Sequence, residues 1–132
     1  MIVVDASAAL EVLLRPATHE RLVERLLGTG ELLVAPHLLD LEVVQVLRRF
    51  AASGELSEQR AGEALEDWSM LRINRYPHET FLRRVWQLRH NLTAYDGIYV
   101  ALAESFDCPL VTCDGPLAAA PGHRATIELF TD

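Results

Sequence analysis

The stretch IVVDAS, residues 2–7, decides the fold class of this chain. Three β-favouring apolar residues lead directly into Asp5, and the pattern then changes to that of a short helix. A buried carboxylate without a partner costs several kcal/mol or becomes protonated. Asp5 is therefore paired, exposed at the end of a strand, or bound to a cation, and the rest of the chain decides between these three.

Short apolar runs alternate with amphipathic segments along the whole chain. We expect strands at 2–5, 32–35, 71–74 and 109–112, with an edge strand at 125–129. We expect helices at 7–14, 18–27, 38–52, 57–70, 78–90 and 94–106. Continuously apolar strands between helices are typical of a parallel sheet covered on both faces. The sequence thus predicts an α/β fold, a three-layer α/β/α domain with a central, mostly parallel sheet in which 2–5, 32–35 and 109–112 are neighbours.

The composition is that of one cytoplasmic globular domain spanning residues 1–132. Half of the 132 residues are hydrophobic, which is enough for a sizeable core. No apolar run reaches the roughly 20 residues that span a bilayer, and the first residues lack the basic start of a signal peptide. We therefore expect no membrane association.

Cysteine and charge exclude further classes. Cys108 and Cys113 bracket the expected strand at 109–112, so they are too far apart for a disulfide, and no spacing suggests a zinc site. The net charge of −7 argues against a nucleic-acid partner, unless several acids surround a divalent cation that offsets them. Every one of the 12 basic residues is arginine.

Two acids come directly after expected strands. Asp5 ends the first strand, and Asp114 comes two residues after Thr112, the last residue of the strand at 109–112. The carboxyl ends of parallel strands meet at one edge of the sheet, where ligands usually bind. Taken alone, Asp114 before Gly115 is an ordinary turn aspartate.

Two further acids begin helices. Glu42 lies near the start of the helix at 38–52, on a polar strip with Gln45 and Arg49 beside the apolar stripe. Asp96 lies in the first turn of a very apolar helix. Taken alone, Glu42 is a surface acid and Asp96 a helix cap. If the four acids converge, however, they need a cation, and oxygen-only sites suit Mg²⁺ or Mn²⁺.

The segments VVDAS, APHLLDLEVVQVLRR, LTAYDGIYVALAE and PLVTCDGPL together resemble the PIN-domain family, and in particular the VapC-type toxins of toxin–antitoxin pairs. The resemblance covers essentially the whole chain. It implies a metal-binding and catalytic quartet formed by Asp5, Glu42, Asp96 and Asp114.

The resemblance also implies residues around this quartet. Ser7 and Thr112 match hydroxyl positions that flank the site. Gln45 departs from the pattern, because many relatives carry asparagine there, and this leaves open whether Gln45 supports Glu42. Arg49 lies two turns after Glu42 on the same face and is our candidate for contacting a substrate phosphate.

The family implies a Mg²⁺-dependent endoribonuclease that is inhibited by a cognate VapB-type antitoxin and that often forms a homodimer. No histidine pair is placed for metal-independent cleavage of RNA, so the carboxylates are expected to act through a metal, with water attacking the phosphodiester. We expect the antitoxin to cover exposed leucines and valines on the helices at 19–27 and 38–50. We expect Asp40 to be solvated and Tyr95 and Tyr99 to be packing residues.

Three alternative protein classes share parts of this pattern. A phosphoacceptor receiver domain needs a lysine and an acid pair after the first strand, and this chain has neither. A haloacid-dehalogenase-like phosphatase needs Asp-x-Asp, but Ser7 stands at the second position. A catalytically inactive PIN-like module that only binds a partner stays open, although all four acids are present.

Overall fold

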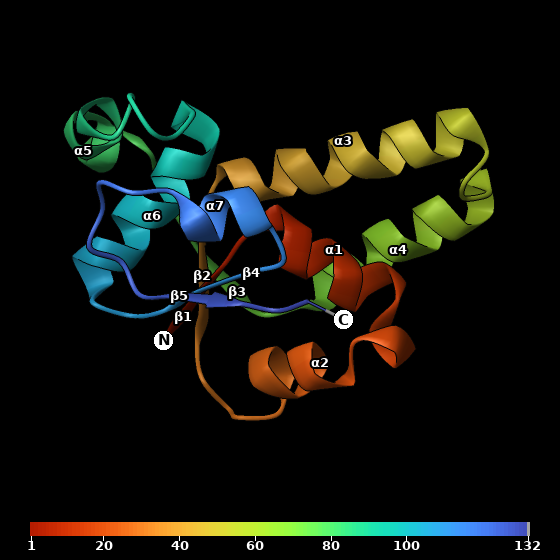
Figure 1. Cartoon of the computed structure of the whole chain (residues 1–132). Helices are drawn as coiled ribbons and strands as arrows, with labels where there is room; N and C mark the ends of the chain where they lie inside the picture. Colours follow the sequence, from red (N-terminus) through yellow and green to blue (C-terminus); the bar gives the residue numbers. More distant parts are fainter. Residues whose placement is uncertain (132) are drawn as a thin grey trace.

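A five-stranded sheet forms the centre of the structure, a computed structural model that describes residues 1–131 (Figure 1). The strands are β1 (Ile2–Val4), β2 (Leu33–Pro36), β3 (Ile73–Tyr76), β4 (Leu110–Thr112) and β5 (Ile127–Leu129). Their order is β3-β2-β1-β4-β5, and every neighbouring pair is parallel. The predicted parallel sheet is confirmed, with 2–5, 32–35 and 109–112 adjacent and 125–129 at an edge.

The helices mostly follow the prediction. They are α1 (Ala6–Leu14), α2 (Glu20–Leu27), α3 (Leu38–Ser53), α4 (Glu58–Met70), α5 (Leu82–Gln87), α6 (Ala94–Phe106) and α7 (Gly115–Ala119), with 3₁₀ turns at Pro16–Thr18 and Glu79–Phe81. The expected helix at 78–90 is wrong in length, because tight turns precede and follow α5. The expected turn after Asp114 is the short helix α7, which Asp114 caps and in whose first turn Pro116 lies.

The direction in which successive strands are added to the sheet reverses at its middle. From β1 the chain adds β2 and then β3 on one side, and it later returns to add β4 and β5 on the other side. Helices α1, α2, α3 and α4 contact one another beside one face, whereas α5 packs on α6, which contacts β1 and β2 (Figure 1). Open α/β sheets bind ligands at the carboxyl ends of the strands where this reversal occurs. In this chain that point lies between β1 and β4.

The strand β1 and the helix α6 both lie within the core. All three residues of β1 are at most 1% exposed, as expected for a central strand. Residues 97–103 of α6 are buried without interruption, so this helix is enclosed rather than amphipathic. Both elements therefore hold the residues at their ends in fixed positions.

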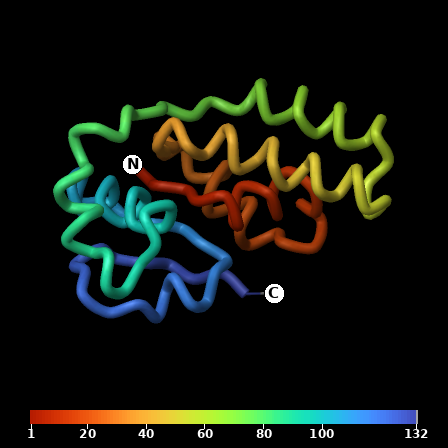
Figure 2. The backbone as a smooth tube through the Cα atoms, turned by 90° about the horizontal axis from the view of Figure 1, so that it is seen from above, coloured from red at the N-terminus to blue at the C-terminus, as the bar shows by residue number. Residues whose placement is uncertain are grey.

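Helices α3 and α4 run side by side as a long antiparallel pair (Figure 2). Asp40 of α3 accepts a hydrogen bond from Trp68 Nε1 of α4 at 2.9 Å. It also forms an ion pair with Arg75 of β3 at 2.7 Å. The expectation that Asp40 is merely solvated is therefore wrong. Its carboxylate joins three elements on one side of the sheet.

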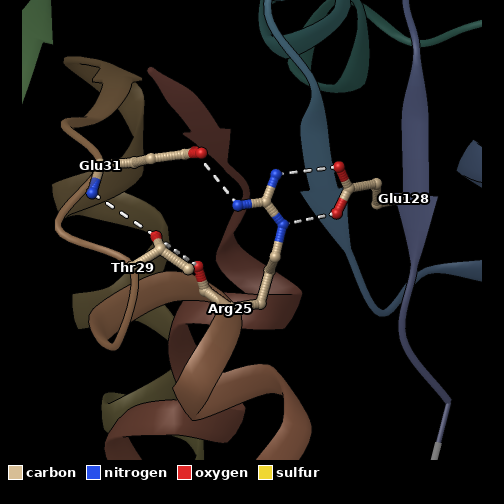
Figure 3. A network of polar contacts seen from close by, with 4 residues as sticks. All are labelled: Arg25, Thr29, Glu31 and Glu128. Atoms are coloured by element: carbon tan, nitrogen blue, oxygen red, sulfur yellow. Dashed lines mark hydrogen bonds and ion pairs between the residues drawn. The ribbon is translucent and has the colours of Figure 1, made fainter.

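A second ionic contact fastens the opposite edge. Arg25 of α2 donates to Glu128 of β5 through Nε and Nη2, at 2.7 and 3.0 Å, and to Glu31 at 3.1 Å (Figure 3). The Arg25 guanidinium lowers the pKa of Glu128 below its ordinary value. This contact ties the edge strand to a helix from the beginning of the chain.

Cys108 and Cys113 are free thiols, as expected. Within residues 1–131, no helix combines the length and the apolar character needed to cross a membrane.

Candidate functional site

The Asp5 carboxylate is almost enclosed, with 5% of the residue exposed. Asp5 follows β1 directly and caps the N-terminus of α1. Ser7 Oγ and the Ala8 N–H donate to Oδ1 at 2.7 and 3.0 Å, and the Thr112 hydroxyl donates to Oδ2. These donors fix both oxygens and favour the charged form.

The hydroxyls of Ser7 and Thr112 join the ends of β1 and β4. Besides donating to Asp5, Ser7 Oγ accepts from the Cys113 N–H at 2.9 Å, and Thr112 Oγ1 accepts from the Asp114 N–H at 3.0 Å. The two hydroxyl oxygens lie 3.2 Å apart. Both predicted flanking hydroxyls therefore lie against Asp5 and also shape the backbone that carries Asp114.

Asp114 lies at the same edge of the sheet, beyond β4. Its Oδ1 accepts from the Leu117 N–H at 3.1 Å, so the side chain caps α7. The capping hydrogen bond uses one carboxylate oxygen of Asp114, and the residue is half-buried.

Glu42 reaches the site from α3. It is half-buried, and its Oε1 accepts a hydrogen bond from the hydroxyl of Tyr99 on α6. Burial and the neighbouring Glu42 raise the pKa of Tyr99, so its hydroxyl stays protonated as a donor. The expectation that Tyr99 only packs therefore missed a polar contact. Its signal in the sequence is its place three residues after Asp96 on the same helix.

Asp96 does not cap its helix. Thr93 is the N-cap of α6, and its hydroxyl oxygen accepts from the Asp96 N–H at 3.1 Å. The simple explanation of Asp96 as a capping residue is therefore excluded. Its carboxylate is half-buried and lies in the first turn of an enclosed helix.

The negative charges of the four acids repel one another in pairs, and these pairs form a closed ring. Burial raises the pKa of Asp5, and the charge of Asp114 adds to this. Burial also raises the pKa of Glu42, with further contributions from Asp5 and Asp96. Burial and the charge of Asp114 raise the pKa of Asp96. Each carboxylate thus interacts electrostatically with two others, and we call this set the carboxylate ring.

The carboxylate ring has no protein cation beside it in the described part of the chain. None of the ion pairs among residues 1–131 involves any of its four members. In the same residues, no three His, Cys, Asp or Glu side chains are grouped closely enough to hold one metal ion between them. The donor set nevertheless fits Mg²⁺ or Mn²⁺, because all its side-chain oxygens are carboxylates and their charges repel one another.

Two predicted residues lie outside these contacts. Gln45 and Arg49 are exposed on α3, and neither side chain makes a hydrogen bond within residues 1–131. Whether Gln45 supports Glu42 therefore stays open, and the binding of a substrate phosphate by Arg49 stays a prediction.

Comparisons with known proteins agree with this architecture. The model of the PIN domain family matches residues 2–122. The chain is 46% identical over 128 residues to Ribonuclease VapC1 of Mycobacterium tuberculosis, an alignment that covers 96% of each chain. It is 45% identical over 114 residues to VapC ribonuclease Mb0985 of Mycobacterium bovis, with 86% of each chain covered.

Solved structures share the fold. The crystal structure of PAE2754 from Pyrobaculum aerophilum superposes with a TM-score of 0.69 and 27% identity, over 96% of this chain and 81% of that chain. VapBC2 from Rickettsia felis, crystallised with a DNA fragment from its promoter, gives a TM-score of 0.69 at 12% identity, over 98% of each chain.

Proposed function

The chain belongs to the PIN-domain family, and within it to the VapC ribonucleases, and from this membership we propose that it is a Mg²⁺- or Mn²⁺-dependent endoribonuclease acting as a cytoplasmic toxin. The observation that carries the proposal is the carboxylate ring at the point where the sheet reverses its strand order. Four acids that repel one another beside buried strands require a counter-charge, and a divalent cation supplies it with oxygen ligands.

The four acids have different tasks in this proposal. Asp5 is held by three donors and is the most rigid ligand for the ion. Asp96 lies on the enclosed helix α6 and Glu42 on α3, so the two acids would supply ligands to the ion from different elements. Asp114 has one oxygen engaged in capping α7 and the other available.

A bound Mg²⁺ would polarise the scissile phosphate and lower the pKa of a coordinated water toward neutrality. Attack of water on the phosphorus would break the P–O3′ bond, a carboxylate oxygen of the site would accept the proton that the water loses, and the leaving 3′-oxygen would take up a proton. Because water is the nucleophile, the 2′-hydroxyl of the RNA does not take part. The products carry 5′-phosphate and 3′-hydroxyl ends. Arg49 is our candidate for binding a phosphate of the substrate on the exposed side of α3.

The experiment is cleavage of total RNA followed by analysis of the ends. Activity is expected with Mg²⁺ and lost with EDTA or in Asp5→Ala. Cleavage that persists in EDTA, or products with 2′,3′-cyclic phosphate, would contradict the mechanism. A folded protein that binds an antitoxin but cleaves no RNA under any metal condition would identify the inactive PIN-like module instead.

We further propose that a VapB-type antitoxin inhibits the protein and that the protein forms a homodimer. A toxin–antitoxin complex from Klebsiella pneumoniae shares the fold, with a TM-score of 0.63 at 17% identity over 90% of this chain and 91% of that chain. The apolar surface offered to a partner is narrower than expected, because Leu22 and Leu26 of α2 are buried. On α3 and α4 the exposed large apolar side chains are Leu41, Val44, Leu65 and Met70, at 70%, 42%, 42% and 83% exposure. Co-purification of the product of a neighbouring reading frame, with loss of RNA cleavage in the complex, tests this partner.

A further inference from the structure

The hydroxyl of Tyr99 contacts Glu42 across two elements that are distant in sequence. Tyr99 lies on α6 and Glu42 on α3, 57 residues apart, and the hydroxyl donates to Oε1. Tyr99 is 2% exposed, so the packing of α6 fixes the position of the ring and of its hydroxyl. The donor is therefore rigid, although its acceptor has a long side chain.

Glu42 depends on this one contact more than Asp5 depends on any of its three. Asp5 is held by Ser7, the Ala8 N–H and Thr112, and Asp114 is held by a backbone N–H. Within residues 1–131, Tyr99 supplies the one hydrogen bond to the Glu42 carboxylate. A glutamate has several freely rotating bonds, and repulsion from Asp5 and Asp96 directs this one away from them.

We propose that Tyr99 is a positioning residue that holds Glu42 in the carboxylate ring through the hydrogen bond from its hydroxyl. This inference rests on the proposed function, since it assigns Glu42 a ligand position that Tyr99 maintains. Tyr99 engages Oε1 and leaves Oε2 for a cation or a water molecule. Groups that hydrogen-bond a metal ligand typically change metal affinity or activity about 10- to 100-fold when they are removed.

The test is Tyr99→Phe, which keeps the buried ring and removes only the hydroxyl. The matched control is Tyr95→Phe on the same helix, because Tyr95 is 64% exposed and makes no hydrogen bond to the carboxylate ring within the described residues. In metal-free protein, the ¹³C resonance of the Glu42 carboxylate is expected to move in Tyr99→Phe and to stay in place in Tyr95→Phe. Binding of Mn²⁺, followed by calorimetry, is expected to weaken about tenfold in Tyr99→Phe alone.

A double-mutant cycle separates positioning from general support of the fold. If Tyr99 acts through Glu42, Tyr99→Phe has no further effect on Mn²⁺ affinity once Glu42→Ala has removed the acceptor. An equal loss in both backgrounds would overturn the inference, because Tyr99 would then support the fold itself. An unmoved Glu42 resonance in Tyr99→Phe would overturn it as well, and so would an unchanged Mn²⁺ affinity where the wild type binds Mn²⁺.

The outcomes also distinguish this inference from the proposed function. If the wild-type protein binds no Mn²⁺ but the Glu42 resonance still moves in Tyr99→Phe, the metal centre is wrong and Tyr99 still holds Glu42. If Mn²⁺ binds to the wild type with the same affinity as to Tyr99→Phe, the metal centre stands and the positioning role of Tyr99 is wrong.

Discussion

Asp5 and Thr112 lie 107 residues apart in the chain, and the hydroxyl of Thr112 donates a hydrogen bond to the Asp5 carboxylate. The bond joins the ends of β1 and β4, the two strands between which the sheet reverses its order. Among the hydrogen bonds that lower the pKa of Asp5, this one has the largest effect. It therefore opposes the burial that otherwise favours the protonated acid.

Thr112→Val keeps the shape of the side chain and removes this donor. The charged Asp5 then loses a partner in a buried place, so we expect the free energy of unfolding at pH 7 to fall by about 1–3 kcal/mol. The loss should shrink near pH 4, where a larger fraction of the carboxyl is protonated. Urea denaturation at both pH values measures it. An equal loss at the two values would mean that the hydroxyl acts through packing alone.

Asp5→Asn tests the pH dependence of stability in the metal-free protein. The pKa of Asp5 is raised above its ordinary 3.8, so the folded state binds a proton more readily than the unfolded chain. Its contribution is therefore most favourable at low pH and declines as the pH rises from about 4 through the raised pKa. We expect the stability of Asp5→Asn relative to wild type to increase over this range and then level off. A difference that does not change with pH would contradict the raised pKa.

A divalent cation should stabilise the wild-type protein against unfolding. A ligand that binds only the folded state at 100 times its Kd adds about 2.7 kcal/mol. We expect this gain with Mn²⁺ and a clear reduction of it in Asp96→Asn. Asp40→Asn is the control, because it removes a carboxylate that pairs with Arg75 outside the carboxylate ring. Thermal unfolding with and without Mn²⁺ measures all three proteins, and an equal gain in Asp96→Asn would remove Asp96 from the site.

The ion pair between Arg84 and Glu104 should matter for stability and not for metal binding. The Glu104 side chain is 2% exposed, and Arg84 Nε lies 2.7 Å from it. Arg84→Met leaves the Glu104 carboxylate with the Arg124 N–H as its one donor among the described residues and with the charge of Arg124 nearby, so we expect a loss of about 1–3 kcal/mol. Adding Glu104→Gln should restore much of that loss, as measured by urea denaturation. If the double variant is less stable than Arg84→Met, the pair does not behave as a buried charge pair.

The sequence predicted the framework of the molecule because apolar runs report burial directly. The strands β1, β2 and β4, their parallel arrangement and the place of Asp5 at a strand end follow from such runs, whereas β3 lies at 73–76 and not at the expected 71–74. The contacts of Asp40 and Tyr99 do not, because each partner comes from an element 28 to 57 residues away. Periodicity tells which face of a helix a side chain lies on, but not which distant side chain meets it.

Short segments were predicted less well for a different reason. Asp114 followed by Gly115 and Pro116 favours a turn as much as the first turn of a helix, and five residues carry too little periodicity to decide. Asp96 and Thr93 show the same ambiguity. Both residue types cap helices, and only the structure shows that Thr93 accepts from the Asp96 N–H.

The central place of β1 between β2 and β4 has a consequence during protein synthesis. A nascent chain that ends before residue 110 has no strand to place on the open side of β1, and one that ends before residue 114 lacks the fourth carboxylate. The surroundings of Asp5, the first of the four acids to be synthesised, are therefore complete only after the residues up to Asp114 have been made.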